Sequence, residues 1–358
     1  MRIGIIGAGQ LGQMLGFAAR KLGHECYFLD PSDNPPAAKA GPVIQAPFDD
    51  QVALSVLADK CGVLTYEFEN VPVAALEAIA GETPIYPPLD ALRLAQDRLT
   101  EKRLFEQLDI PLPGYRVIDS ASDLVQAAET IGLPLVIKTR RMGYDGKGQF
   151  VLKDMDQVET AWQELGGSAL IAEQWVRFDY EVSAIGVRSA SGEVASYCLT
   201  QNEHAGGILR ISRAPVDDPQ LSRKANQYMQ VLLDHLDYVG VLALELFVVG
   251  DELLANEYAP RVHNSGHWTI EGAETSQFSN HILAISGEKP GPTTSFGHAG
   301  MVNLIGEIPN AARELSNAAM HDYGKSARQD RKLGHLTVIA DSADERDTLV
   351  AQIAKTVT

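Results

Sequence analysis

Cysteine is scarce in this sequence, and the few cysteines form no recognisable pattern. Cys26, Cys61 and Cys198 are odd in number and widely separated, so they match neither a disulfide framework nor the paired spacing of a zinc site. The chain also has no uncharged apolar run of about 18 residues, and its N-terminus enters a strand pattern rather than a cleavage site. These absences predict an untargeted, cytoplasmic protein that does not span a membrane.

Basic residues are outnumbered by acidic ones. The 358 residues include 30 Lys and Arg against 47 Asp and Glu, which gives a formal net charge of −17. This charge disfavours general binding to nucleic acid or to an anionic membrane, so any anionic ligand must be held by local clusters of Lys and Arg. With 45% hydrophobic residues, the length predicts two or three globular domains with buried cores.

The hydrophobic patterns predict an open α/β unit to about residue 95, followed by a mixed unit and an antiparallel one. In the first unit we expect strands at 2–6, 25–29 and 62–66, a glycine turn at 7–12, and helices at 13–22 and 50–60. A single charged helix at 90–108 should follow. Beyond it we expect strands at 133–138, 149–152, 169–176, 181–188, 193–201 and 333–339, and helices at 155–165, 218–236 and 343–355.

A predicted hairpin sets two carboxylates against each other. Two apolar segments flank a turn at 250–252, and a three-residue loop there places Glu245 opposite Glu257 and Phe247 opposite Ala255. Directly opposed side chains have Cβ atoms roughly 5 Å apart. Carboxylates that close repel unless one pKa rises or a divalent cation such as Mg²⁺ lies between them. A solvated hairpin with two surface acids would show the same pattern.

The segment GAGQLG at 7–12 matches the dinucleotide-binding fingerprint. Asp30 follows its last glycine by eighteen residues, the place of an acid that binds a ribose hydroxyl. Alone, this motif indicates a nicotinamide-dependent oxidoreductase. The same glycines also allow a tight, closely packed turn in α/β domains that bind no nucleotide there, and nothing later in the chain indicates hydride transfer.

Other groups of residues could bind phosphate or a polar ligand. Lys138 precedes the loop GYDGKGQ at 143–149, whose backbone N–H groups could wrap phosphates, although the spacing is not that of a Walker motif and a surface hairpin is the simpler alternative. The segment 256–267 is dense in polar groups around the guanidinium of Arg261. A zinc site there is disfavoured, because two histidines lack a third ligand. Lys325, Arg328, Arg331 and Lys332 form a basic cluster.

Taken together, Lys138, GYDGKGQ, Glu245, NEYAPR (256–261) and HNSGH (263–267) resemble the ATP-grasp superfamily. Within it they resemble the 5-(carboxyamino)imidazole ribonucleotide synthetase family, ATP- and bicarbonate-dependent ligases of purine synthesis. The likeness extends from GAGQLG to QDRKLGH, almost the whole chain. It implies an α/β and α+β fold with three parts: a Rossmann-like pre-ATP-grasp domain at 1–95, a linker helix and lid domain at 96–178, and a larger C-terminal ATP-grasp domain with a mixed, largely antiparallel sheet and a small subdomain at 179–358.

The resemblance also implies site residues, with ATP between the lid and the C-terminal domain. Those for ATP are Arg98, Lys138, Gly143, Tyr144, Asp145, Gly146, Lys147, Gly148, Gln149, Glu173, Gln174, Trp175, Val176, Glu181, His204, Asn256 and Glu257. Those for the imidazole ribonucleotide are Glu67, Tyr144, Asp145, Lys147, Arg261, His263, Asn264, Ser265, Lys325 and Arg331. Glu245 and Glu257 are implied for Mg²⁺. The residues implied to take part in catalysis are Tyr144, Asp145, Lys147, Arg261 and His263.

The implied reaction has two steps. Bicarbonate attacks the γ-phosphate of ATP to give carboxyphosphate and ADP, and the exocyclic amine of the substrate then captures carbon dioxide or the mixed anhydride. Asp145 and His263 are both candidates for the base, and a homodimer is expected. Some relatives carry Arg at Lys147, and Gln329-Asp330 stands where a Pro-Gly turn is common. A formate-dependent glycinamide ribonucleotide transformylase is the alternative within the superfamily.

Overall fold

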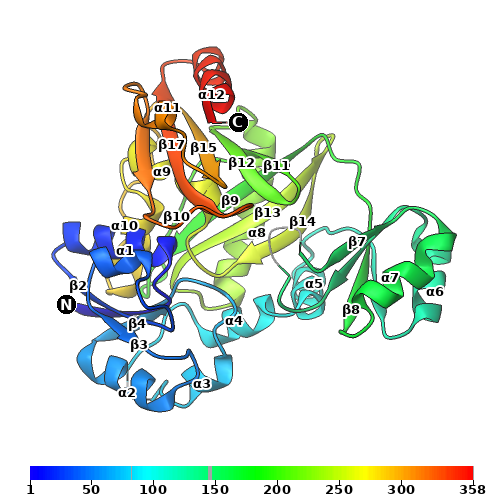
Figure 1. The fold of residues 1–358 in the computed structure, drawn as a ribbon, viewed down its shortest axis with the longest axis horizontal. Coiled ribbons are helices and arrows are strands. Elements are labelled where there is room, and N and C mark those ends of the chain that lie inside the picture. The colour runs from blue at the N-terminus through cyan, green and yellow to red at the C-terminus, as the bar shows by residue number, and fades with distance from the viewer. Residues whose placement is uncertain (82, 144–146, 358) are drawn as a thin grey trace.

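The structure is a computed structural model that describes residues 1–81, 83–143 and 147–357. Three lobes make up the molecule, as Figure 1 shows: the N-terminal lobe at the lower left, a small lobe at the right, and the large C-terminal part above and between them. Within the described ranges, the helices are all too short or too polar to cross a membrane.

The N-terminal lobe is built on a parallel sheet with the strand order β3-β2-β1-β4. Its elements are β1 (Arg2–Ile6), α1 (Gln10–Lys21), β2 (Glu25–Asp30), η1 (Pro36–Lys39), β3 (Val43–Gln45), α2 (Gln51–Lys60), β4 (Val63–Tyr66) and α3 (Val73–Glu77). The predicted βαβ unit is confirmed. Helix α1 begins inside the predicted turn, because Gly9 is the N-cap and Gln10 is already helical.

The prediction of one helix at 90–108 is wrong. The segment forms α4 (Leu89–Ala95) and α5 (Arg98–Gln107), separated at Asp97. The backbone of Asp97 is extended, and its side chain accepts a hydrogen bond from the N–H of Leu99 at 3.0 Å. Aspartate favours this N-cap conformation over a helix interior. The break lets α5 start in a new direction with Arg98 at its first turn.

The small lobe is a four-stranded antiparallel sheet with the order β5-β8-β6-β7. Its elements are β5 (Tyr115–Ile118), α6 (Ala121–Ile131), β6 (Leu135–Thr139), β7 (Gln149–Leu152), η2 (Met155–Gln157), α7 (Val158–Leu165) and β8 (Leu170–Gln174). Both α6 and α7 lie on the outer face of this sheet in Figure 1 and share a core with it. The inner face is therefore left for the rest of the molecule. Neither β5 nor α6 was predicted.

The C-terminal part contains a sheet of nine described strands in the order β14-β13-β9-β11-β12-β15-β17-β16, with β10 paired to β9. Its strands are β9 (Tyr180–Arg188), β10 (Val194–Ser196), β11 (Thr200–Ala205), β12 (Ile208–Ala214), β13 (Gly240–Val249), β14 (Glu252–Ala259), β15 (His298–Ile305), β16 (Ala319–Asp322) and β17 (Lys332–Ala340). The described helices are α8 (Pro219–His235), η3 (Asn264–Gly266), α9 (Thr269–Gly272), α10 (Gln277–Ile285), α11 (Asn310–Arg313) and α12 (Ala343–Val357).

The prediction of one strand at 193–201 is wrong as well. The segment divides into β10 and β11, which pair with different parts of β9. Tyr197 and Leu199, between the two strands, are buried, so their burial is not part of a continuous strand pattern. Strand β12 and helix α10 were not predicted.

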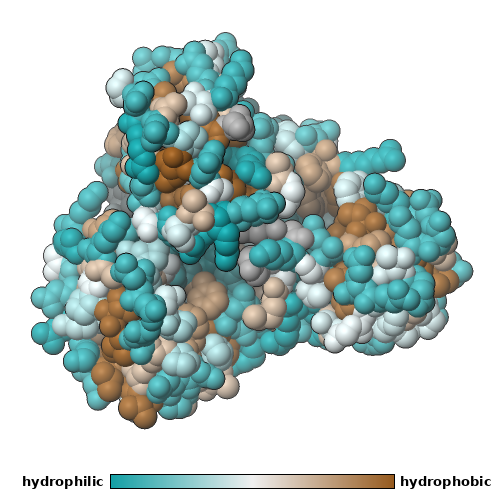
Figure 2. All heavy atoms as spheres, viewed as in Figure 1, coloured by the Kyte–Doolittle hydropathy of each residue, from teal (hydrophilic) through white to brown (hydrophobic). Residues whose placement is uncertain are grey.

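One hydrophobic core joins the N-terminal lobe to the large sheet. Helix α10 packs against α1 and against β13, and its Phe278 and Ile282 belong to the same buried cluster as Leu15 of α1 and Ile185 of β9. Because this cluster is continuous, the N-terminal lobe and the C-terminal sheet are packed as one unit. Figure 2 shows a hollow near the centre of the molecule, bordered mainly by hydrophilic residues.

Candidate functional site

The glycine turn before α1 is occupied by a carboxylate of the protein itself. Gly9 N donates to Oε1 of Glu67 at 2.5 Å and Gly12 N donates to Oε2 at 2.6 Å. A Cβ at Gly7 would lie 2.4 Å from Cγ of Glu67, so the glycine is needed for this approach. Helix N-termini bind anions through free N–H groups. Here Glu67, rather than a pyrophosphate, takes that place.

Asp30 is also engaged within the turn. It is buried, its Oδ2 accepts from Ala8 N at 2.8 Å, and its Oδ1 accepts from Ser32 N at 2.9 Å. The acid that a dinucleotide fold would offer to a ribose hydroxyl therefore stabilises the loop. Together with Glu67, this explains the fingerprint by close packing without a nicotinamide cofactor.

The predicted basic cluster lies beside this turn. Lys325 Nζ donates to the side-chain oxygen of Gln10, the first residue of α1. Burial, followed by the positive charge of Arg331, lowers the pKa of Lys325 to about 8, while the charge of Glu67 opposes the shift. Lys325, Arg331 and Glu67 are thus close enough to influence one another, although Lys325 and Gln10 are 315 residues apart in the chain.

The turn before Arg331, where a Pro-Gly turn was expected, is formed by Gln329 and Asp330. Arg331 N donates to the carbonyl of Arg328 at 3.1 Å, and Asp330, the third residue of this turn, has φ +60°. A positive φ at the third position is the pattern of a type II turn, which explains why Pro-Gly suits it. Aspartate tolerates this conformation better than most residues. Arg331 Nη1 then donates to Ser326 Oγ at 2.9 Å.

On the hairpin, Glu245 and Glu257 are directly paired, as predicted. The route to this pairing differs from the prediction. The turn has two residues, with Val249 opposite Glu252, and Phe247 lies opposite Leu254 rather than Ala255. A register shift after Glu245 restores the predicted pair, because β14 carries one extra residue, Asn256.

The two carboxylates have different partners and different acidities. Glu257 Oε2 accepts from Arg98 Nη1 at 2.9 Å, whereas Glu245 Oε1 lies 3.1 Å from His263 Nε2. Burial opposes ionisation at Glu257, but Arg98 and then Lys138 outweigh it and lower its pKa to about 2. Burial and then the charge of Glu257 raise the pKa of Glu245 to about 7.

This pair fits a site for one divalent cation completed by a ligand. Burial and then repulsion by Glu257 raise the pKa of Glu245, and a cation between the carboxylates would relieve the repulsion. Within the ranges that the structure describes, no group of three or more His, Cys, Asp or Glu residues could hold a metal. Two carboxylates plus substrate phosphate oxygens are a usual set for Mg²⁺, whereas a closed protein site is not.

Three cations from α5 and β6 surround a buried glutamate. Lys138 Nζ donates to Glu173 Oε2 at 2.9 Å, and Lys102 Nζ lies 3.3 Å from the same oxygen. Burial opposes ionisation of Glu173, but Lys102, Lys138 and Arg98 lower its pKa to about 2. In this arrangement the Glu173 side chain neutralises the cations expected to hold phosphates.

Lys102 was missed by sequence reasoning. Its Nζ also donates to the backbone carbonyl of Asn256 at 3.0 Å, so it ties α5 to the extra residue of β14. The available signal was its position four residues after Arg98, on the same face of a helix. The side-chain oxygen of Asn256 is buried and has no hydrogen-bond partner among the described residues, which leaves it free for a ligand.

The segment after β8 lines a cavity. Gln174, Trp175 and Val176 border a space of about 390 Å³ together with residues 131–134 of the small lobe and Val249 and Leu254 of the hairpin. The walls mix apolar side chains such as Val176, Val249 and Leu254 with the polar Gln174 and Arg177, as suits a flat base with polar edges. Next to this segment, His204 Nδ1 lies 2.6 Å from Glu181 Oε2; burial opposes protonation, yet the contact with Glu181 raises the pKa of His204.

The glycine-rich loop is anchored at its base. Arg140 donates to both carboxylate oxygens of Asp97, at 2.9 and 2.7 Å, and Thr139 N donates to the carbonyl of Gly148 at 2.8 Å. A Cβ at Gly143 would lie 3.6 Å from Nη2 of Arg98. This end of the loop is therefore beside Arg98, one of the residues expected to bind phosphates. Lys147 is exposed, as is Gln149 at the start of β7, and Tyr144, Asp145 and Gly146 lie outside the described residues.

The HNSGH segment is held by hydrogen bonds to neighbouring strands and helices. His263 Nδ1 lies 2.8 Å from Oγ of the buried Ser265, and the side chains of Asn264 and Asn303 form two hydrogen bonds, at 3.1 and 2.6 Å. Burial and then the charge of Arg261 lower the pKa of His263 well below its usual value. His263 is therefore neutral, with Nε2 directed at Glu245.

A buried polar row supports this segment, and sequence reasoning did not identify it. Asn202 Nδ2 donates to Ser183 Oγ at 2.6 Å, and Ser212 Oγ donates to Asn202 Oδ1 at 2.8 Å. Asn303 continues the row by donating to the carbonyl of Leu209 at 2.9 Å. Polar residues alternating with apolar ones in β9, β11, β12 and β15 were the available signal.

Arg261 completes the cluster from the side of the N-terminal lobe. Its Nε donates to Glu69 Oε2, and the charges of Glu69, Glu257 and Glu67 together raise its pKa despite burial. Arg261 therefore stands between the carboxylate pair of the hairpin and the turn that holds Glu67. The cluster thus has cations at both ends, Arg98 and Lys138 beside the hairpin and Lys325 and Arg331 beside the glycine turn, with a neutral imidazole between them.

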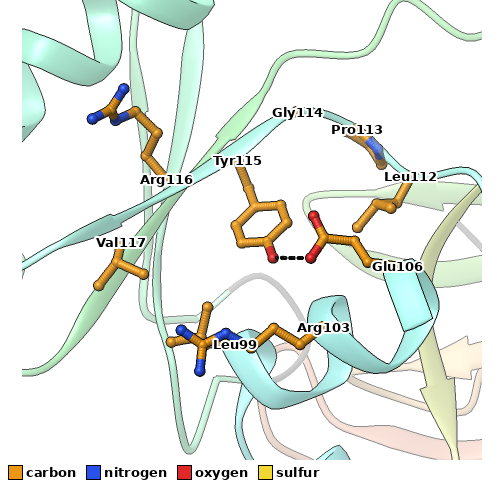
Figure 3. Close-up of a pocket in the computed structure, with 9 residues that line it drawn as sticks. All are labelled: Leu99, Arg103, Glu106, Leu112, Pro113, Gly114, Tyr115, Arg116 and Val117. Carbon is orange, nitrogen blue, oxygen red and sulfur yellow. Dashed lines mark hydrogen bonds between the residues drawn. The ribbon is translucent and has the colours of Figure 1, made fainter.

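A second cavity, of about 470 Å³, lies between α5 and β5 and contains none of the predicted residues. Figure 3 shows Tyr115 pointing across it to Glu106, with the Tyr115 hydroxyl donating at 2.9 Å. Its walls offer neither paired carboxylates nor a cluster of cations, so we place the site at the first cluster.

Three family models match consecutive parts of the chain: a ribonucleotide synthetase preATP-grasp domain at residues 1–96, an ATP-grasp domain at 103–278, and a phosphoribosylaminoimidazole carboxylase C-terminal domain at 299–348. The N5-carboxyaminoimidazole ribonucleotide synthase of Pseudomonas aeruginosa is 46% identical over 357 residues, which cover 99% of this chain and 98% of that one. These matches confirm the predicted ATP-grasp fold with an N-terminal preATP-grasp domain.

Two solved structures are similar over almost the whole chain. The N5-carboxyaminoimidazole ribonucleotide synthetase of Thermus thermophilus has a TM-score of 0.95 and 46% identity, covering 99% of this chain and 98% of that chain. The N5-carboxyaminoimidazole synthase of Aspergillus clavatus, in complex with ADP and 5-aminoimidazole ribonucleotide, has a TM-score of 0.92 and 30% identity, covering 99% and 98%.

Because Glu67 and Asp30 are used within the glycine turn, we expect no binding of NAD at this turn. Isothermal titration calorimetry should detect ATP binding in the presence of Mg²⁺ and no heat of binding for NAD under the same conditions. NAD binding that persists when ATP is present, and that weakens in a Gly9→Ala variant, would contradict this interpretation.

Proposed function

The chain belongs to the N5-carboxyaminoimidazole ribonucleotide synthase family, and from this premise we propose how its residues divide the work of the reaction. It is an ATP-dependent ligase that carboxylates 5-aminoimidazole ribonucleotide in purine biosynthesis. The observation that carries the proposal is a site with two anion-binding ends. One is formed by Arg98 and Lys138 beside the Glu245–Glu257 hairpin, and the other by Lys325 beside Glu67.

ATP binds between the small lobe and the hairpin. Arg98 and Lys138 contact its phosphates, and the loop from Gly143 to Gln149 covers them. The base lies in the cavity lined by Gln174, Trp175 and Val176. Next to it, the Glu173 side chain neutralises Lys138, one of the cations that contact the phosphates. Glu181 and His204 face the ribose, and Asn256 offers its unpaired side-chain oxygen.

Glu245 and Glu257 would hold Mg²⁺ together with phosphate oxygens. Their repulsion favours a cation between them, and among the described residues no group of three or more acidic, His or Cys side chains could hold a metal. When bound, the cation neutralises the charge that develops on the phosphates during transfer. The protein's own contribution is to keep Glu257 ionised through Arg98, at 2.9 Å, so that one ligand is always charged at neutral pH.

5-Aminoimidazole ribonucleotide occupies the other end of the site. Lys325 and Arg331 hold its phosphate, and Glu67 contacts the ribose or the amine from the glycine turn. Arg261, His263, Asn264 and Ser265 surround the imidazole, with Ser265 acting through the ring of His263, which it orients at 2.8 Å. This arrangement directs the amine towards the hairpin, where the phosphates lie.

The chemistry proceeds in two steps. Bicarbonate oxygen forms a bond to the γ-phosphorus as the bond to ADP breaks, giving carboxyphosphate; the amine nitrogen then bonds to its carbon as phosphate leaves and the amine loses a proton. The candidates for the base that takes this proton are His263 and Asp145, of which Asp145 lies outside the described residues. Arg261 stabilises the anionic intermediate, and Tyr144 and Lys147 on the loop help to exclude water.

We also propose domain boundaries near residues 95 and 178. The family matches at 1–96 and 103–278 support the first of these boundaries. Membership in a purine-biosynthesis family supports a cytoplasmic enzyme, and the resemblance of the chain to that family supports a homodimer.

The proposed activity predicts ADP formation that needs both bicarbonate and 5-aminoimidazole ribonucleotide for full rate. A coupled assay for ADP should show the rate falling when either is omitted, because the acceptor amine and the acid are both consumed. Glycinamide ribonucleotide with formate is the matched control and should give no more than the background rate. Full activity with that pair would instead identify a formate-dependent transformylase.

Glu257→Gln should lose most of the activity, by about tenfold or more, because a neutral amide is a weaker ligand for Mg²⁺ than a carboxylate. Titration of ADP formation with Mg²⁺ should show a higher half-saturating concentration. Glu252→Gln, at an exposed position on the same hairpin, serves as the control and should behave as the unsubstituted enzyme. Unchanged bicarbonate-dependent turnover in Glu257→Gln would rule out the metal assignment.

The lowered pKa of Lys325 predicts loss of substrate affinity at alkaline pH. Below a pKa of about 8 the ammonium is charged and binds phosphate; as the pH rises through 8 the charge is lost, and kcat/KM for 5-aminoimidazole ribonucleotide should fall by about tenfold per pH unit. Lys325→Arg keeps its charge, so its profile should lack this decline. The same inflection in both enzymes would show that another group titrates.

A further inference from the structure

His281, on α10, bridges two strands that carry opposite sides of the site. It is fully buried; its Nδ1 accepts from Val241 N at 3.1 Å, and its Nε2 lies 2.9 Å from Thr65 Oγ1. A backbone N–H can only donate, so Nδ1 is the acceptor. Burial lowers the pKa of His281 to about 3, so the ring is neutral, and its one proton is on Nε2, which donates to Thr65.

The positions of the two partners connect this bridge to the reaction. Thr65 is on β4, two residues before Glu67, which faces the imidazole ribonucleotide. Val241 is on β13, four residues before Glu245, which faces the nucleotide phosphates. Strands β4 and β13 belong to different sheets, so their separation is not set by the hydrogen bonds of one sheet. The bridge supplies a directional link between them.

The chain makes room for this link. Gly240, just before Val241, has φ +119°, and a Cβ there would lie 3.0 Å from Cε1 of His281. A side chain at this position would be strained and would press on the imidazole. The ring is thus seated against the start of β13, and the packing of α10 on α1 and β13 keeps it there.

We infer that the Thr65–His281–Val241 bridge is a positioning device: it sets the distance between the amine-binding side of the site, at Glu67, and the phosphate-binding side, at Glu245. This inference rests on the proposed function. The amine must meet a short-lived carboxylated intermediate before water does, and a displacement of about 1 Å can cost such a reaction about 100-fold. Loss of the bridge should therefore increase the ATP that is hydrolysed without formation of carboxylated product.

Thr65→Val tests the bridge with little change of shape, because it removes the hydroxyl that accepts from His281. We expect the product formed per ADP released to fall at least about threefold, with the KM for ATP within about twofold of the unsubstituted enzyme. Thr65→Ser retains the hydroxyl and should restore the ratio. The two products are measured in one reaction, ADP by a coupled assay and carboxylated product by retention of labelled bicarbonate.

Thr83→Val is the matched control. Thr83 is also buried, and its Oγ1 donates to the carbonyl of Ala58 at 3.1 Å, a bond within the N-terminal lobe. It should lower the melting temperature without changing the product-to-ADP ratio. If Thr65→Val fails to fold, Thr65→Cys replaces it, because a thiol is a weak acceptor of similar size, and partial uncoupling is expected.

The outcomes separate the two proposals. If ADP formation by the unsubstituted enzyme does not depend on bicarbonate and 5-aminoimidazole ribonucleotide, the proposed function is overturned. A coupled unsubstituted enzyme whose folded Thr65→Val or Thr65→Cys variant keeps a normal ratio would overturn the bridge alone. So would an equal loss of coupling in Thr83→Val, because it would trace the effect to general destabilisation.

Discussion

Carboxylates in need of cations are the constraint on which this structure depends. Glu257 is neutralised by Arg98 of α5, and Glu173 by Lys102 and Lys138. Glu173 is buried, where an unpaired charge is costly, and the partly exposed Glu257 is paired with Glu245 on the hairpin. Each carboxylate therefore requires a cation that arrives from another segment. The break at Asp97, the antiparallel lid sheet and the extra residue in β14 serve this requirement, because they bring α5, β6 and the hairpin to one place.

Local patterns in the sequence were sufficient for most of the elements around the site and for the opposition of Glu245 and Glu257. The hairpin also illustrates their limit. The prediction assumed a three-residue turn and an unbroken register; the two-residue turn and the bulge at Asn256 each shift the register by one residue and cancel at Glu257. The predicted pairing of Phe247 with Ala255 is wrong while that of Glu245 with Glu257 is right, so the bulge lies between these two pairs. Bulges are set by contacts such as that of Lys102 with the Asn256 carbonyl, which local alternation does not encode.

Other features depend on contacts distant in sequence. The fingerprint at 7–12 is a sound local prediction of a strand-turn-helix unit, but what fills the turn is decided 55 to 58 residues later, at Glu67. The individual site residues were assigned from the resemblance to a family and not from the spacing of residues in the sequence. Ser183 of the polar row lay in a predicted strand, whereas Asn202 and Ser212 lay in strands that the patterns divided wrongly or did not detect. Alternation marks the polar residues of one strand but does not show which strands pair, so it could not align the three.

The contact between Lys138 and Glu173 has a further consequence for how the enzyme meets its nucleotide. Lys138 Nζ lies 2.9 Å from Glu173 Oε2, so the lysine already has a counter-ion within the protein. A phosphate that binds Lys138 therefore replaces one anion with another and does not bind an unpaired cation. Such an exchange makes stray phosphate a poor competitor, since it must displace a tethered carboxylate. It also makes nucleotide affinity less sensitive to ionic strength than a site of unpaired cations would be.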